Sequence, residues 1–125
     1  MHPPKLFQTT LKKLRQIDQE RRRLMSLFSK NDPLIAGSYG ETAIPCGKPT
    51  CHCHQHGGHF ATRLARWVDG KMKTQIIRIA DREWVAKASA SYKAHKAALK
   101  EVEQLHAQEL EVLKQVVKLK TVDYK

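Results

Sequence analysis

The chain has 125 residues, enough for one domain with a modest core (residues 1–125) but not for two domains. Its apolar fraction of 41% argues against a disordered chain, and no apolar run approaches the length of a bilayer span. Lys and Arg total 23 against 12 Asp and Glu, so the net charge is +11 and a polyanion, most often nucleic acid, is the expected partner.

The N-terminus carries no signal-peptide core, so we expect a cytoplasmic protein in a reducing compartment. An anionic membrane surface is the rival to nucleic acid as a polyanionic partner. It would require an amphipathic helix with bulky apolar residues facing the lipid. We therefore expect no membrane association.

Residues 9–30 are predicted to form a helix, because their apolar side chains recur at steps of three and four. Thr9 or Thr10 is the expected N-cap, and a proline after residue 32 would stop the helix. The polar side of this helix is strongly basic and supplies the first candidate phosphate contacts, which are Lys12, Lys13, Arg15, Arg21, Arg22 and Arg23.

The middle of the chain, residues 34–80, contains a cluster of cysteines and histidines. Cys46, Cys51 and Cys53 lie within eight residues, and an odd, tightly spaced set is a poor disulfide framework. Zinc favours four thiolate and imidazole ligands, and closed structural sites are often of the three-cysteine, one-histidine type. We expect one structural zinc ion on these cysteines, with His59 or, alternatively, His56 as the fourth ligand.

A β-hairpin is predicted after the cysteines, from strands at residues 60–68 and 71–79 around Asp69-Gly70. This turn pairs Trp67 with Met72, and residues 35–44 add a third strand. Phe60, Leu64, Ile77 and Ile79 are expected to share the face that covers a core. Further candidate phosphate contacts are Lys48, Arg63, Arg66, Lys71 and Lys73. Trp67 has two interpretations, a base-stacking side chain or a core residue.

Residues 81–120 are predicted to form one long helix with Asp81 as its N-cap. An interrupted coiled-coil heptad runs along it through Val85, Ala88, Tyr92, Leu99, Val102, Leu113 and Val116. Other apolar residues lie off that stripe, which indicates a second packing partner. The expected fold class is α+β: an N-terminal helix, a small zinc-bound three-stranded unit, and a long helix packed antiparallel on the first.

The string Cys46-Gly47-Lys48-Pro49 with Cys51 and Cys53, together with Asp69-Gly70-Lys71, resembles a family of small, uncharacterised basic prokaryotic proteins with a CGKPxCxC motif. Some members of that family are encoded beside transposases. The resemblance, over about residues 35–115, implies an accessory protein of a mobile element. Here His59 precedes Phe60 directly, where the family has His-Gly-Pro-aromatic, so His56 and His59 both remain as the equivalent residue.

The sequence bears on three classes of function. The first is a non-catalytic nucleic-acid-binding accessory protein, with DNA favoured over RNA and little sequence preference. The alternative is a helical adaptor that binds a transposase- or recombinase-type partner, or a second copy of itself. An enzyme is not expected, because the cysteine-rich site suits a closed structural ion and the middle of the chain has too few carboxylates for a two-metal nuclease.

Overall fold

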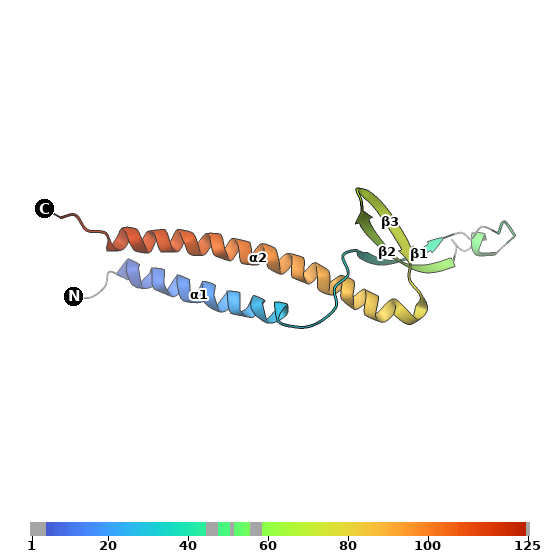
Figure 1. Cartoon of the computed structure of the whole chain (residues 1–125), viewed down its shortest axis with the longest axis horizontal. Coiled ribbons are helices and arrows are strands. Elements are labelled where there is room, and N and C mark those ends of the chain that lie inside the picture. Colours follow the sequence, from blue (N-terminus) through green and yellow to red (C-terminus); the bar gives the residue numbers. More distant parts are fainter. Residues whose placement is uncertain (1–4, 45–47, 51, 56–58, 125) are drawn as a thin grey trace. The chain divides into compact units, whose positions relative to one another are not determined.

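A computed structural model of the chain describes residues 5–44, 48–50, 52–55 and 59–124 (Figure 1). The described elements are α1 (Lys5–Phe28), β1 (Ser38–Ile44), the short 3-10 helix η1 (His52–Gln55), β2 (His59–Val68), β3 (Lys71–Ile76), a second 3-10 helix η2 (Ile79–Asp81) and α2 (Arg82–Lys120). The predicted α+β class, in which a three-stranded sheet lies between two helices in the order of the chain, is confirmed.

Backbone contacts divide the chain into two compact units, and α2 contributes to both. The helical unit comprises Met1–Asn31 and His95–Lys125, and the sheet unit comprises Asp32–Ala94. Within the described ranges, no helix has both the length and the apolar content needed to cross a membrane.

The observed helix boundaries correct one of the two predicted caps. α1 begins at Lys5, so Thr10 lies inside it, where its hydroxyl donates a hydrogen bond of 2.8 Å to the Leu6 carbonyl. A threonine satisfied by its own helix can be buried on the apolar face, and Thr10 is only 3% exposed. α2 begins at Arg82, directly after the predicted cap Asp81.

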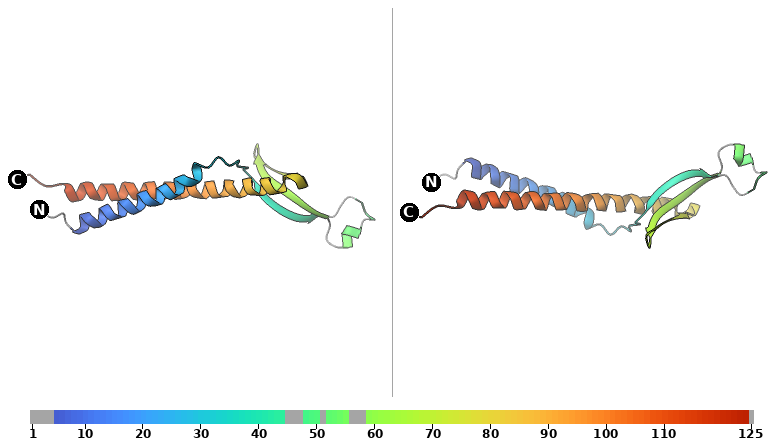
Figure 2. Two further views of the ribbon diagram at one scale, coloured as in Figure 1. Left: turned by 90° about the horizontal axis from the view of Figure 1, so that it is seen from below. Right: turned by 90° about the horizontal axis from the view of Figure 1, so that it is seen from above.

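In the helical unit, α1 and the C-terminal part of α2 lie side by side in opposite directions (Figures 1 and 2). Ile17 and Leu24 of α1 are buried, as are Ala98 and Val112 of α2. At the opposite end of α1 from Lys5, the rings of Phe28 and His95 meet edge to face at 5.4 Å. The predicted contact between the two helices is therefore confirmed.

The apolar seam of α2 differs from the predicted heptad. The side chains that are buried or half-buried in the helical unit lie at steps of three and four: His95, Ala98, Val102, Leu105, Glu109, Val112, Val116 and Leu119. Leu99 and Leu113, which were expected in the seam, are exposed. Apolar residues cover more than one side of this helix, so periodicity alone did not identify the side that packs on α1.

The sheet has the strand order β1-β2-β3, and both pairs of neighbours are antiparallel. The predicted turn is present, because Asp69 and Gly70 adopt φ angles of 52° and 78°, as a two-residue hairpin turn of the I′ kind requires. Trp67 pairs with Met72 in the predicted register. Figure 2 shows the three strands as one twisted sheet.

The core of the sheet unit lies where β2 meets the first turns of α2. Leu64, Ile77 and Val85 are buried together, with Ile35 and Tyr39 packed against them. Ile79 was expected on this face but is exposed, because β3 ends at Ile76 and the chain turns into η2. The next residue, Ile77, still closes the sheet, since its N–H donates to the Thr62 carbonyl at 2.9 Å.

Two hydrogen bonds tie α2 to the segment before β1. The Ser89 hydroxyl donates to the Gly37 carbonyl at 2.7 Å, and the Ile35 N–H donates to the Ala88 carbonyl at 3.1 Å. Both bonds belong to the sheet unit. They hold the start of β1 against the helix and so fix the surface on which the hairpin cations lie.

Candidate nucleic-acid interface

The β2–β3 hairpin presents an aromatic side chain to solvent. Because strand side chains alternate between faces, Trp67 lies on the face opposite to buried Leu64, together with its cross-strand partner Met72. Trp67 is 70% exposed and Met72 is also exposed. Trp67 is therefore not a core residue. An exposed indole has a large apolar face available for stacking.

A hollow of about 390 Å³ adjoins this tryptophan. Trp67 and Met72 line one part of it, and Tyr92 and Lys93 of α2 line another. All of these residues belong to the sheet unit. The hollow thus combines two aromatic side chains with the cations Arg66 and Lys93, a combination found where bases stack beside their phosphates.

The predicted hairpin cations gather around the turn. Arg66 and Lys73 are cross-strand partners, and Lys71 begins β3. The Arg66 guanidinium donates to the Gln75 side-chain oxygen at 3.4 Å. Among the described residues no ion pair engages Lys71 or Lys73, and both are exposed. Their charges therefore face solvent.

Arg63 differs from the other hairpin cations. It lies on the same face as Trp67, opposite Ile76, and is only partly exposed. Its Nε atom is buried and has no hydrogen-bond partner within the part of the chain that the structure describes. A buried donor without a partner is costly, but because this atom is closed to solvent it is not itself a contact for a ligand.

The six predicted cations of α1 fall into two groups. Lys12, Lys13 and Arg15 are exposed, and no ion pair joins them to another described residue. The remaining three, Arg21 to Arg23, are held by carboxylates.

Arg21 Nη2 donates to Glu109 Oε2 at 2.8 Å, and this pair is partly buried between the helices. Arg22 pairs with Asp18 at 3.1 Å on the same helix. These interactions make Arg21 a structural residue of the helical unit rather than a free phosphate contact.

Arg23 hydrogen-bonds Glu20 and lies 3.6 Å from Glu101 of α2. The hydrogen bond from Arg23 lowers the pKa of the Glu20 carboxyl, and the same bond raises the pKa of Arg23. Glu20 therefore stays ionised to lower pH than a free glutamate, which keeps this cation neutralised in the folded protein.

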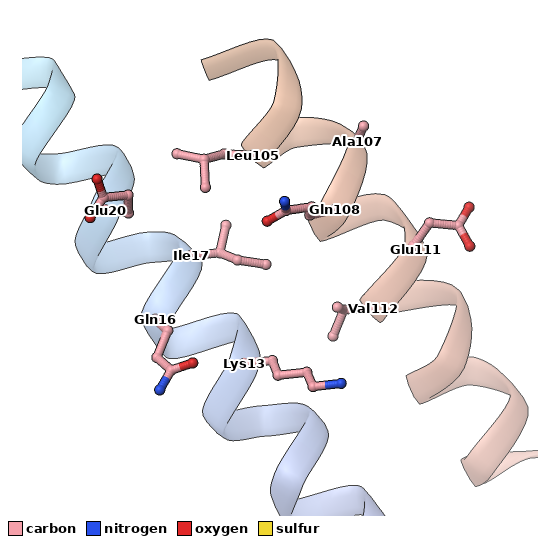
Figure 3. Close-up of a pocket in the computed structure, with 9 residues that line it drawn as sticks. All are labelled: Lys13, Gln16, Ile17, Glu20, Leu105, Ala107, Gln108, Glu111 and Val112. Carbon is pink, nitrogen blue, oxygen red and sulfur yellow. The ribbon is translucent and has the colours of Figure 1, made fainter. Parts of the chain in front are cut away.

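The groove beside these ion pairs is shown in Figure 3. Its volume is about 660 Å³, and Ile17 of α1 points in it toward Leu105 and Gln108 of α2. Lys13 and Glu20 on one helix and Glu111 on the other give it polar walls. The mixed charges do not form a phosphate site, since anionic walls oppose an anionic ligand.

The predicted metal ligands lie largely outside the described residues. This holds for Cys46, Cys51 and His56, and for the side chains of Cys53 and His59. The described backbone places Cys53 in η1 and His59 at the start of β2, where His59 pairs with Ile44 of β1. No group of three potential ligands occurs among the described side chains. Lys48 is exposed on the connection between these two strands.

Sequence reasoning missed two side chains beside the tryptophan, Tyr92 and Lys93. They lie on α2, far from Trp67 in sequence, and no local pattern predicts that they share a hollow with it. It also missed Arg78, which follows β3 and is exposed, with Asp81 at 3.9 Å. Its place within the expected strand 71–79 was the one signal that could have added it to the basic set.

Comparison with curated proteins and with solved structures gives no match. The profile of one protein family, described as a domain of unknown function (DUF6788), matches residues 10–87. That range holds most of α1, the whole sheet and the first turns of α2. The expected membership of an uncharacterised family is confirmed, while the CGKPxCxC motif and the link to transposases stay predictions. Because the match covers more than half of its length, the chain belongs to the DUF6788 family.

Proposed function

We propose that this protein is a non-catalytic, zinc-binding accessory protein that binds nucleic acid, DNA in preference to RNA, in a DNA transaction of a mobile element. The observation that carries the proposal is the exposed Trp67 on a hairpin whose tip bears Arg66, Lys71 and Lys73. Aromatic side chains combined with a basic groove are the recurring elements of single-strand binding surfaces.

The arrangement favours unpaired bases over duplex DNA. A base in a duplex is stacked on both faces and cannot reach an indole, whereas an unpaired base stacks on it without any sequence requirement. The hollow beside Trp67, with Tyr92 and Lys93, supports the same interpretation. Arg63 adds a positive charge on the same face. We therefore expect single-stranded or junction DNA to bind more tightly than blunt duplex.

Phosphate contacts supply most of the affinity in this proposal. Lys71 and Lys73 are the hairpin contacts, and Lys12, Lys13 and Arg15 form a second basic set on α1. Each phosphate neutralised releases a counterion, so the affinity falls steeply with salt. The part-buried ion pair with Glu109 argues for removing Arg21 from the expected interface, whereas Arg22 and Arg23 are exposed and their surface ion pairs are weak.

The proposed zinc ion is structural. Cys46, Cys51 and Cys53 supply three thiolates, and His59 or His56 supplies the imidazole. The pairing of Ile44 with His59 supports the fit, because it draws together the two ends of the segment that carries all the ligands. When bound, the ion would cross-link this connection and hold Lys48 near the strand ends. Metal content per chain in single His56→Ala and His59→Ala variants would distinguish the two histidines.

The test of the proposal is binding of fluorescent single-stranded DNA, duplex DNA and single-stranded RNA at two salt concentrations. Trp67→Ala is expected to weaken single-strand binding about tenfold, the lower range for one stacked base. Trp84→Ala is the matched control, because Trp84 is also part-exposed but donates to Asp81 at 3.0 Å and lies away from the hollow. Lys71→Ala is expected to reduce the slope of log affinity against log salt by about one.

Two results would contradict the proposal. One is binding that does not change with salt. The other is equal affinity of the wild type and Trp67→Ala for single strands. A direct readout uses the Trp84→Phe variant, in which Trp67 is the remaining indole, because only a base stacked on Trp67 quenches its fluorescence.

A further inference from the structure

α2 carries a second apolar stripe in the helical unit, separate from the seam that contacts α1. The second stripe consists of residues at steps of three and four, namely Leu99, Glu103, His106, Leu110, Leu113 and Val117. Its four apolar members are between 42% (Leu113) and 66% (Val117) exposed. Such a run on one helix face is unusual for a surface that water alone covers.

The second stripe lies at a defined angle to the seam. At 3.6 residues per turn, its centre is about 100° around the helix from the centre of the seam. In a four-helix bundle each helix contacts two neighbours in directions about 90° apart. α1 occupies the first direction, and the second stripe occupies the other.

The two sides of the α1–α2 pair differ in polarity. Lys13 and Glu20 of α1 and Gln108 of α2 line the groove on one side. The opposite side carries more apolar residues, which are Leu11 and Met25 of α1 and Leu99 and Leu113 of α2, although Asp18 lies between the first two and His106 between the last two. Met25 is also exposed. The opposite side is therefore the more apolar of the two.

The core of the helical unit is small without a further partner. Its described buried apolar residues are Ile17, Leu24, Ala98 and Val112. A pair of helices has no third layer to cover its outer apolar side, and stable helical folds usually close that side with more helices. Covering the second stripe would bury its four apolar side chains at once.

We propose that a second copy of this chain covers the second stripe, so that two α1–α2 pairs associate into an antiparallel four-helix bundle. A symmetric dimer requires a self-complementary surface. If the two copies of α2 run in opposite directions and meet at residue 108, Leu99 lies opposite Val117 and His106 lies opposite Leu110. Glu103 of one copy then lies beside Leu113 and Lys114 of the other. A parallel arrangement would instead place Glu103 against Glu103, which is repulsive.

The available area is sufficient for such a dimer. From Leu99 to Val117 the stripe is about 27 Å long and about 10 Å wide, a footprint of about 270 Å² for α2. If α1 contributes an equal footprint beside it, each copy buries about 540 Å² and the pair about 1,100 Å². This exceeds the threshold of about 1,000 Å² for a specific interface.

The first test measures the mass of the full-length chain by sedimentation, after nucleic acid has been removed at high salt. Concentrations from about 1 to about 100 µM bracket a micromolar dissociation constant. We expect a dimer. Leu113→Glu should raise the dissociation constant at least about tenfold, because it buries a charge in the contact. Gln115→Glu is the matched control, since it adds the same charge on the other side of α2 and should leave the dimer intact. Circular dichroism of each variant separates loss of association from loss of helix.

The second test fixes the direction of pairing. Leu99→Glu and Val117→Lys should each weaken the dimer alone, and an equimolar mixture of the two should recover it, because only antiparallel chains bring residue 99 against residue 117. A mixture that stays monomeric overturns the antiparallel arrangement. A wild-type chain that is monomeric throughout the concentration range overturns the proposal and leaves the second stripe to a different protein.

Discussion

At the scale of single residues, Gly37 determines how closely the segment before β1 approaches β2. A Cβ atom at this position would lie 2.9 Å from the Leu64 side chain and 3.0 Å from the Ala65 carbonyl oxygen. Leu64 is the centre of the sheet-unit core, and the Gly37 carbonyl also accepts the hydrogen bond from Ser89. Protein atoms therefore lie close to Gly37 both where a Cβ atom would be and at its carbonyl oxygen.

We therefore predict that Gly37→Ala destabilises the protein by about 1 to 3 kcal/mol, the usual cost of overpacking a filled site. Gly40→Ala is the matched control, because nothing lies within 4 Å of a Cβ atom there and an exposed change of this kind stays within about 0.5 kcal/mol. Urea unfolding followed by tryptophan fluorescence measures both. Equal midpoints for the two variants would contradict the packing argument.

Single residues also show which contacts could be predicted from the sequence and which could not. Leu64, Ile77 and Val85 were each expected in apolar faces and are buried. Trp67 was left as either a base-stacking or a core residue, although alternation from Leu64, expected in the core, already places it on the opposite face. The contact between Gly37 and Leu64 joins distant parts of the chain, and no local pattern indicates it.

At the scale of elements, local chemistry predicted more than global packing. Asp69-Gly70 fixed the hairpin register because few residue pairs adopt two positive φ angles in succession. The seam of α2 was predicted only in part: Val102 and Val116 lie in it, but Leu99 and Leu113 belong to the second stripe, which has an equally regular spacing. The basic face of α1 was taken as uniform, although Asp18 and Glu20 on the same helix and Glu101 and Glu109 on the other pair with its arginines.

The basic face of α1 leads to a prediction about two arginines. Arg21→Gln should lower the free energy of unfolding by about 1 kcal/mol, since it leaves the part-buried Glu109 without its guanidinium, and should change DNA affinity little. Arg15→Gln, at an exposed position, should weaken DNA binding and leave stability unchanged. Thermal unfolding and DNA titrations of both variants test the division. If Arg21→Gln weakened DNA binding more than Arg15→Gln, the ion pair would not be the main role of Arg21.

At the scale of the whole molecule, the core of the sheet unit and the proposed zinc segment occupy different parts of the strands. The Cys/His segment joins β1 to β2 beyond the pair Ile44–His59. Leu64 lies five residues further along β2, a distance of about 17 Å at the rise of a strand. A zinc ion that held the whole middle of the chain would, on removal, unfold all of residues 34–80. The apolar core and the Ser89–Gly37 hydrogen bond argue for a more local effect.

We predict that chelation of the proposed zinc ion lowers amide protection at the strand ends near Ile44 and His59, while protection near Leu64 and Ile77 persists. Hydrogen exchange with and without chelator measures both regions in one experiment. The helical signal in circular dichroism should change little, because the ligand segment lies outside α1 and α2. Cys53→Ser should reproduce the effect without chelator. Loss of protection throughout β2 and β3 would mean that the metal, and not the Leu64 core, holds the hairpin in place. Trp67 and its neighbouring cations would then depend on the ion for their positions, and DNA affinity should fall with metal content.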